Sequence, residues 1–76
     1  GVAIMNIQVN DRVVEVFSGA QVADALRAYS QVTWKQVQNG AKVVLDGAGH
    51  EVALDGALAE GSRLRVKRAA RRGGRA

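Results

Sequence analysis

The segment from residue 4 to residue 17, IMNIQVNDRVVEVF, decides the fold. Its residues alternate between apolar and polar on either side of Asn10-Asp11, a pair that tolerates the positive φ angles of a two-residue hairpin turn. Such a turn fixes the register of the two strands, so that one set of cross-strand pairs is wholly apolar and faces the core. The predicted pairs are Ile7 with Val14 and Met5 with Val16 on the core side, and Asn6 with Glu15 and Gln8 with Val13 on the other side.

After the hairpin the apolar residues recur at i, i+3, i+4 and i+7, which predicts an amphipathic helix. The start of this helix is left open by two possible capping boxes, one of Ser18 with Gln21 and one of Gln21 with Asp24. The predicted apolar stripe consists of Val22, Ala25, Leu26 and Tyr29.

The segment SQVTWKQVQNG, residues 30–40, predicts a short second helix or a continuation of the first. Ser30 is a plausible N-cap, and Asn39-Gly40 is a C-terminal stop. Its apolar positions are Val32, Trp34 and Val37. We expect Trp34 to face the core, and the alternative is an exposed anchor for a partner, because tryptophan is enriched at interface hot spots.

The rest of the chain predicts three more strands. KVVLD and EVAL flank a glycine-rich turn, DGALAEG is a one-turn connector, and SRLRVKR is a last strand with Leu64 and Val66 directed inward. Since so few apolar residues cannot support an isolated meander, these strands should join the hairpin in one mixed sheet packed on one main helix. The predicted fold is an α+β domain with the order ββα(α)βββ.

Length and composition limit the classes of function. Seventy-six residues allow one small domain, and a large catalytic cleft is not expected. The absence of cysteine excludes a disulfide scaffold, thiol catalysis and cysteine-bound zinc, and it suits a cytoplasmic protein. No apolar run approaches the roughly 20 residues that span a bilayer, so no membrane partner is predicted.

The charge is unevenly distributed along the chain. Residues 1–62 carry four basic and seven acidic side chains, whereas the last fourteen residues carry seven basic and no acidic ones. We therefore divide the chain into a domain at residues 1–68 and a flexible basic, glycine-containing tail at residues 69–76.

The predicted order and several short motifs resemble the β-grasp (ubiquitin-like) family, and within it the small bacterial sulfur carriers of thiamine and molybdopterin biosynthesis. The motifs are MNIQVND, GAQV before a helix containing Leu26, LDGALAEGSRLRV, and Gly73-Gly74 beyond the last strand. Two features depart from the family: Gln21 stands where threonine is usual, and Arg75 and Ala76 follow the glycine pair.

The resemblance implies a carrier or modifier that performs no catalysis and binds no cofactor or metal of its own. In the family an adenylating enzyme uses ATP to activate the terminal glycine carboxylate, which here implies Gly73 and Gly74 as the activated C-terminus. A processing protease would first have to remove Arg75 and Ala76. The family also implies a partner interface on the exposed sheet face, at Val13, Phe17, Arg63 and Arg65, together with Ile4.

A second reading treats the protein as a non-catalytic β-grasp binding module. Its basic tail would contact RNA or an acidic partner through phosphate or carboxylate neutralisation. A solvated tail without a partner is the third alternative. The tail cations are Lys67, Arg68, Arg71, Arg72 and Arg75. His50 is the only histidine and predicts no metal site.

Overall fold

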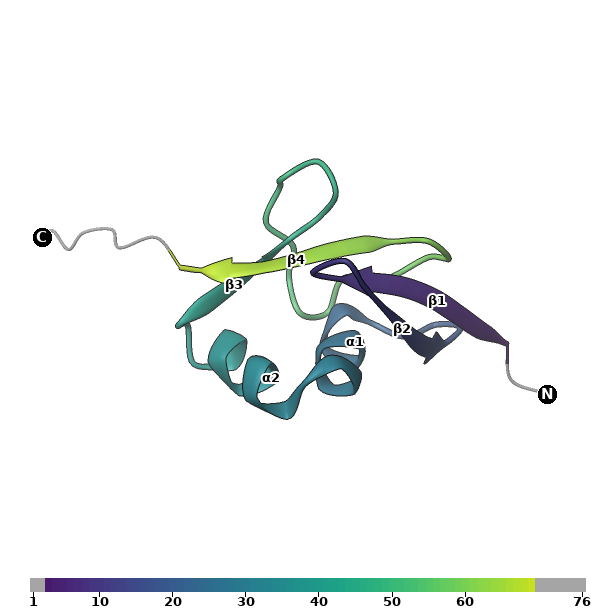
Figure 1. The fold of residues 1–76 in the computed structure, drawn as a ribbon, viewed down its shortest axis with the longest axis horizontal. Helices are drawn as coiled ribbons and strands as arrows, with labels where there is room; N and C mark the ends of the chain where they lie inside the picture. Colours follow the sequence, from purple (N-terminus) through teal and green to yellow (C-terminus); the bar gives the residue numbers. More distant parts are fainter. Residues whose placement is uncertain (1–2, 70–76) are drawn as a thin grey trace, which may run out of the picture.

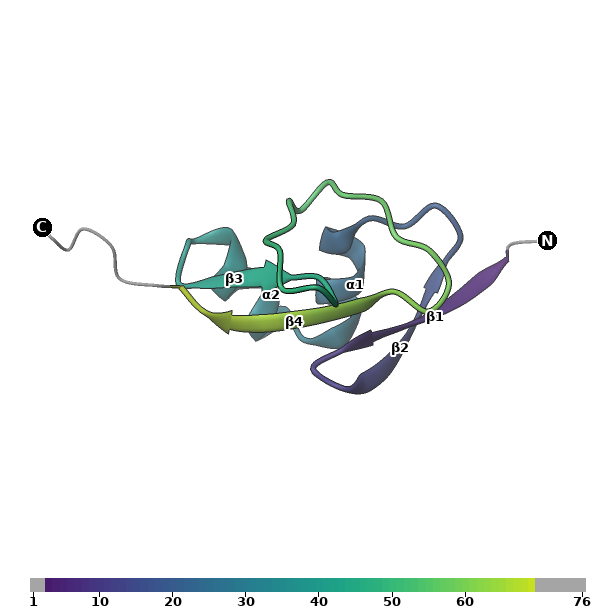
Figure 2. The ribbon, with the colours of Figure 1, turned by 90° about the horizontal axis from the view of Figure 1, so that it is seen from above.

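The computed structural model of the chain describes residues 3–69. These residues form a small α+β domain in which one mixed four-stranded sheet carries both helices on the same face (Figure 1 and Figure 2). The strand order is β2-β1-β4-β3, with β1 antiparallel to β2 and parallel to β4, and with β3 antiparallel to β4. The elements are β1 (Ile4–Val9), β2 (Arg12–Phe17), α1 (Val22–Tyr29), α2 (Gln31–Gln38), β3 (Lys42–Leu45) and β4 (Arg63–Arg68).

The β1–β2 hairpin has the predicted register, including all four predicted cross-strand pairs. Asn10 and Asp11 adopt φ angles of 52° and 69°, so the two-residue turn is formed with both residues in the left-handed region. This turn geometry matches the twist of the flanking strands, which explains why Asn-Asp fixes the register.

Helix α1 begins at the later of the two predicted positions. The backbone N–H of Gln21 donates to Asp24 Oδ2 at 3.0 Å, which forms half of a capping box. The next two N–H groups, of Val22 and Ala23, donate to the carbonyls of Gly56 and Leu54, each at 2.9 Å. A distant loop therefore completes the N-terminus of this helix.

Helix α2 has the predicted cap and stop. Ser30 Oγ accepts a hydrogen bond from the Thr33 N–H at 3.2 Å, and Gly40 leaves the helix with φ of 87°. Trp34 is half-buried and packs against the core, as expected, with the Arg27 guanidinium 5.4 Å from the centre of its ring. Val32 is 66% exposed and contributes nothing to that packing.

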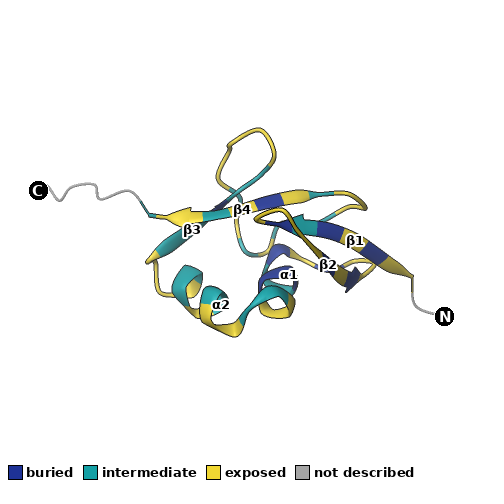
Figure 3. Cartoon of the chain, in the orientation of Figure 1, coloured by how far each residue is buried: buried dark blue, intermediate teal, exposed yellow. Residues whose placement is uncertain are grey.

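The hydrophobic core lies between the sheet and the helices, and most of it comes from the hairpin and α1 (Figure 3). Val9, Ala25 and Leu26 have no exposed surface, and Ile7 and Val44 are 1% exposed. Leu64 on β4 is buried and Val66 is half-buried, as predicted from their alternation. The buried residues are Met5, Ile7, Val9, Val14, Val16, Ala20, Val22, Ala25, Leu26, Val44 and Leu64.

The predicted strand at residues 51–54 is wrong. Only an isolated bridge joins Leu45 to Glu51, and one hydrogen bond runs from the Val52 N–H to the Val44 carbonyl. The chain then leaves the sheet because the carbonyls of Leu54 and Gly56 are needed at the N-terminus of α1. The order of elements is therefore ββααββ, with four strands in the described chain.

The connector predicted from DGALAEG as a single turn contains two turns instead. Residues 54–55 and 60–61 form tight turns joined by irregular chain. Gly61 adopts φ of 82° and its N–H donates to the Asn6 carbonyl at 2.9 Å. The connector is thus fastened to the side of β1 that faces β4, just before β4 begins.

Candidate functional site

The face of the sheet that carries no helix presents a line of positive charge along β4. Arg63, Arg65 and Lys67 are exposed, because the residues that alternate with them point into the core. Successive members stand two residues apart, roughly 7 Å along an extended strand. We call these three residues the basic row. The sequence analysis had assigned Lys67 to the tail, but the structure places it in this row.

The hairpin turn is folded against the basic row. The Asn10 N–H donates to the Leu64 carbonyl at 2.9 Å, and Asn10 Oδ1 accepts from the Val66 N–H at the same distance. This brings an Asp11 carboxylate oxygen to 3.9 Å from the Arg65 guanidinium. Both side chains are largely exposed, so the pair adds little stability and leaves Arg65 accessible.

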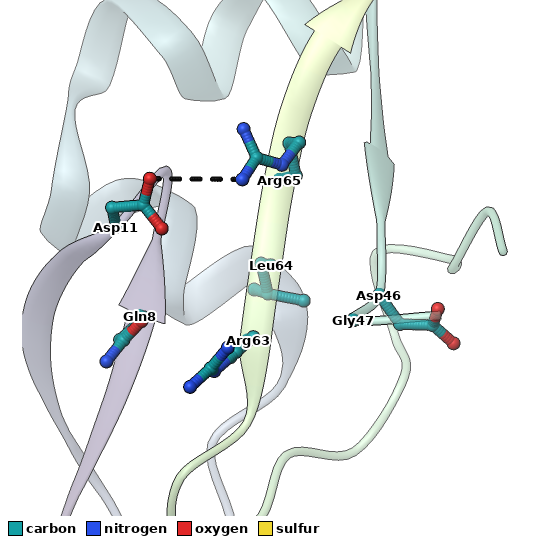
Figure 4. A pocket seen from close by; sticks show the side chains of 7 residues that line it. All are labelled: Gln8, Asp11, Asp46, Gly47, Arg63, Leu64 and Arg65. Atoms are coloured by element: carbon teal, nitrogen blue, oxygen red, sulfur yellow. Dashed lines mark ion pairs between the residues drawn. The ribbon is translucent and has the colours of Figure 1, made fainter. Parts of the chain in front are cut away.

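A surface hollow of about 110 Å³ lies beside the basic row (Figure 4). Arg65 is directed toward Asp11, whereas the Asp46 carboxylate is directed away from both arginines (Figure 4). Within residues 3–69, Arg63 makes no ion pair. The hollow therefore offers a guanidinium to an anionic group of a partner. Its lining residues are Gln8, Asp11, Asp46, Gly47, Arg63, Leu64 and Arg65.

Asp46 shapes the loop beside the hollow and is not a free ligand. Its Oδ1 accepts from the N–H groups of His50 and Ala48, each at 2.9 Å. These hydrogen bonds hold the pKa of the Asp46 carboxyl below its usual value, and the bond from the His50 N–H has the largest effect. The His50 side chain is 81% exposed, and residues 3–69 contain no cluster of three metal-ligating side chains.

A second, wider hollow of about 410 Å³ adjoins the first. The two hollows share the lining residues Asp46, Gly47, Arg63 and Leu64. The lining of the second hollow includes the apolar residues Val22, Val52 and Leu58 together with Ser62 and Arg63. Such a groove can accept an apolar group attached to an anion. Neither hollow was anticipated from the sequence, because each needs the loop after β3 to lie beside β4, and that arrangement depends on long-range contacts.

The predicted partner residues lie on this helix-free face. Ile4, Val13 and Phe17 are 57%, 60% and 53% exposed on the hairpin. Gln8 is paired with both Val13 and Arg63, so one strand separates the apolar residues from the basic row. The role of these residues in binding a partner stays a prediction.

The point where the chain leaves the sheet is also basic. Lys67 and Arg68, assigned to the tail in the sequence analysis, are the last two residues of β4 and pair with Val43 and Lys42. The Ala69 N–H then donates to the Ala41 carbonyl at 3.0 Å. Lys42 was missed because its position opposite Arg68 depends on the β3–β4 register. The remaining predicted site residues, Arg71, Arg72, Gly73, Gly74 and Arg75, lie outside the described residues.

Comparison with known proteins gives no family: no family model, no curated protein and no solved structure matches the chain. Neither helix of the described region has the length and apolar character needed to cross a membrane. The function therefore has to be argued from the residues and their geometry.

Proposed function

We propose that this chain is a β-grasp protein of the sulfur-carrier and ubiquitin-like class, with Gly73-Gly74 as its working end. Its sheet is compatible with that fold, because the first and last strands are parallel neighbours at the centre and the helices lie on one face. The observation that carries the proposal is the position of β4. This strand is paired on both sides and ends at Arg68, five residues before Gly73 in the sequence.

The proposed chemistry takes place at the terminal carboxylate. A carboxylate resists nucleophilic attack because it is an anion without a good leaving group. An adenylating enzyme would join the Gly74 carboxylate to the AMP portion of ATP and release pyrophosphate. A sulfur or amine nucleophile would then displace AMP. Glycine suits this step because, lacking Cβ, its backbone can enter a narrow channel in conformations closed to other residues.

This mechanism requires that Gly74 become the C-terminus. Arg75 and Ala76 follow it in the chain and must be removed by a protease. The chain itself supplies the substrate and no catalytic group, and the ATP belongs to the partner enzyme. We place this chemistry in the cytoplasm.

Adenylation can be tested by the exchange of labelled pyrophosphate into ATP in an extract of the source cells. A chain ending at Gly74 should stimulate exchange, and the chain ending at Ala76 should stimulate it less or only after a delay for cleavage. A chain ending at residue 74 with the substitution Gly74→Ala is the matched control and should be weaker than its parent. Equal and negligible exchange with all three chains would contradict the proposal.

A second candidate is a binding module for RNA or an acidic protein, favoured by the basic row. Arg63, Arg65 and Lys67 are exposed, and within residues 3–69 the only ion pair that they make is that of Arg65 with Asp11, at 3.9 Å. Such a surface attracts polyanions without catalysing a reaction.

This candidate predicts binding of single-stranded RNA or of a polyglutamate peptide that weakens steeply with salt. The double substitution Arg63→Glu with Arg65→Glu should abolish it. Lys35→Glu, a charge reversal at an exposed residue of α2, is the control and should have a smaller effect. Removing Arg75 and Ala76 should barely affect this binding, which separates it from the carrier proposal.

A further inference from the structure

The two edges of the sheet differ in how they are protected. At the β3 edge, the Val52 N–H donates to the Val44 carbonyl at 2.9 Å, and the Asp46 N–H donates to the His50 carbonyl at 2.8 Å. The loop after β3 thus folds back over its own strand. Strand β2 is the other edge, and no segment of residues 3–69 pairs with its outer side. An uncovered edge strand is a template for pairing with another chain.

The hairpin register shows which backbone groups of β2 point outward. Next to a two-residue turn, the flanking pair of Val9 and Arg12 exchanges hydrogen bonds, and every second pair does so thereafter. The 2.7 Å bond from the Ser18 N–H to the Ala3 carbonyl continues this alternation. The N–H and C=O groups of Val13 and Glu15, and the N–H of Phe17, are therefore directed to the edge. The Phe17 carbonyl already accepts from the Ala20 N–H at 3.0 Å.

The side chains of the same three residues are also exposed. Val13 and Phe17 are more than half exposed and stand two residues on either side of Glu15. Ile4, paired with Phe17, adds a third exposed apolar side chain. Strand β2 contains neither proline nor lysine, the two residues that most commonly blunt a free edge. The edge thus combines free backbone groups with an apolar, acidic, apolar pattern.

A second copy of this chain fits this edge poorly. The antiparallel register that pairs all three outward residues sets Val13 opposite Phe17 of the copy, and it sets Glu15 opposite Glu15 of the copy. Like charges directly opposite each other in a sheet are destabilising. Within residues 3–69, Glu15 makes no ion pair that would neutralise it.

We propose that the β2 edge binds an extended segment of a partner protein as an added strand. The segment carries lysine or arginine opposite Glu15 and apolar side chains two residues to either side. Backbone hydrogen bonds at Val13, Glu15 and Phe17 hold it, and the charge pair sets its register. This site is independent of the proposed chemistry at Gly74 and of the basic row.

The probe for this proposal is an acetylated and amidated peptide, Thr-Val-Thr-Lys-Thr-Val-Thr, titrated into the full chain and followed by amide chemical shifts. The largest shifts should occur at Val13, Glu15 and Phe17, and hydrogen exchange should slow at their amides. A peptide with glutamate in place of lysine should bind roughly three- to tenfold more weakly. A peptide with proline at the centre should not bind, because it lacks the central N–H and its ring distorts the strand.

Two variants of the chain make the test specific. Glu15→Lys should reverse the preference between the lysine and glutamate peptides. Glu51→Lys changes charge equally at an exposed residue near the covered β3 edge, and it should leave the preference unchanged. Non-specific attraction to a chain of net charge +4 predicts the opposite preference, for the glutamate peptide.

The proposal is overturned by any of four results. These are shifts confined to β3 and β4, tighter binding of the glutamate peptide, a preference that survives Glu15→Lys, and no saturable binding of the lysine peptide. A stable dimer of the free chain linked through β2 in sedimentation and crosslinking experiments would also overturn it, because repulsion between the two Glu15 side chains should prevent that pairing.

Discussion

Two regions of the domain are held together by different forces. The hairpin with α1, residues 4–29, supplies nine of the buried side chains, including Ile7 and Leu26. The connection from residue 46 to residue 62 contains no fully buried residue, and it is held by hydrogen bonds such as the 2.9 Å bond from the Ala59 N–H to Ser62 Oγ. The first region depends on packing and the second on turn geometry. The second should therefore open locally at a lower free energy, and it is the region that borders both hollows.

The largest expected effect comes from emptying the core of the first region. Leu26→Ala should lower the free energy of unfolding by about 3 kcal/mol, because Leu26 is fully buried. The matched change in the second region, Leu58→Ala, should cost only about 1 kcal/mol, since Leu58 is half-buried. Urea unfolding followed by circular dichroism measures both. Equal losses in the free energy of unfolding would show that the two regions do not differ in how much they depend on packing.

The next effect tests the turn that joins the hairpin to β4. Asn10→Ala removes the acceptor for the Val66 N–H and places alanine at a φ of 52°, so it should cost about 2 kcal/mol. Asn10→Gly also loses the acceptor but tolerates the positive φ, and it should recover about half of that loss. Both variants can be compared by urea unfolding. If the glycine variant were the less stable of the two, the strain argument would be wrong.

A smaller effect concerns the acid sensitivity of the second region. Hydrogen bonding to the Asp46 carboxylate lowers its pKa in the folded state, so the stability it contributes is present above about pH 4 and is lost as the pH falls through the folded pKa. Asp24, whose pKa is lowered chiefly by the Gln21 N–H, behaves in the same way in the first region. Asp46→Asn should reduce stability at pH 7 and flatten its decline below pH 4, measured by urea midpoints between pH 2 and pH 7.

The two carboxylates can be separated by amide hydrogen exchange. Protonation of Asp46 should accelerate hydrogen exchange at the amides of Ala48 and His50, because both N–H groups donate hydrogen bonds to the Asp46 carboxylate. The amides of α1 should respond to Asp24→Asn instead. Uniform acceleration across both regions would mean that acid destabilises the domain as a whole.

The smallest expected effect is a gain in stability. Lys42 stands opposite Arg68 at the chain exit, and like charges in that position repel. Lys42→Glu should therefore raise the free energy of unfolding by about 0.5 kcal/mol at low salt, and the gain should shrink in 1 M salt. Lys35→Glu on α2 is the control for the change in net charge. A gain that is unaffected by salt would have another cause.

The sequence predicted the elements whose signals are local. The Asn10-Asp11 turn fixed the hairpin register, the apolar stripe located α1, and Ser30 and Gly40 bounded α2. The prediction of a strand at residues 51–54 was wrong. The chain there turns away from the sheet, and the carbonyls of Leu54 and Gly56 accept hydrogen bonds from the N–H groups of Ala23 and Val22, about thirty residues earlier in the chain. Such long-range hydrogen bonds cannot be predicted from a local sequence pattern.

The same distinction applies to the candidate site. Strand alternation was enough to predict that Val13, Phe17, Arg63 and Arg65 share an exposed face. The same alternation along SRLRVKR places Lys67 beside Arg63 and Arg65, although Lys67 had been assigned to the tail. It could not show that Lys42 lies opposite Arg68, because that position depends on the pairing of β3 with β4. The hollows beside Arg63 could not be predicted from the sequence, because both depend on where the loop after β3 lies relative to β4.

The central claim is that Gly74 becomes an activated C-terminus, and intact-protein mass spectrometry of the untagged chain from its native cells tests it most directly. We predict a species that ends at Gly74, accompanied by one heavier by the mass difference between sulfur and oxygen or by a covalent conjugate through Gly74. A chain that ends at Ala76 under every growth condition would contradict the claim, and it would leave the basic row as the better guide to function.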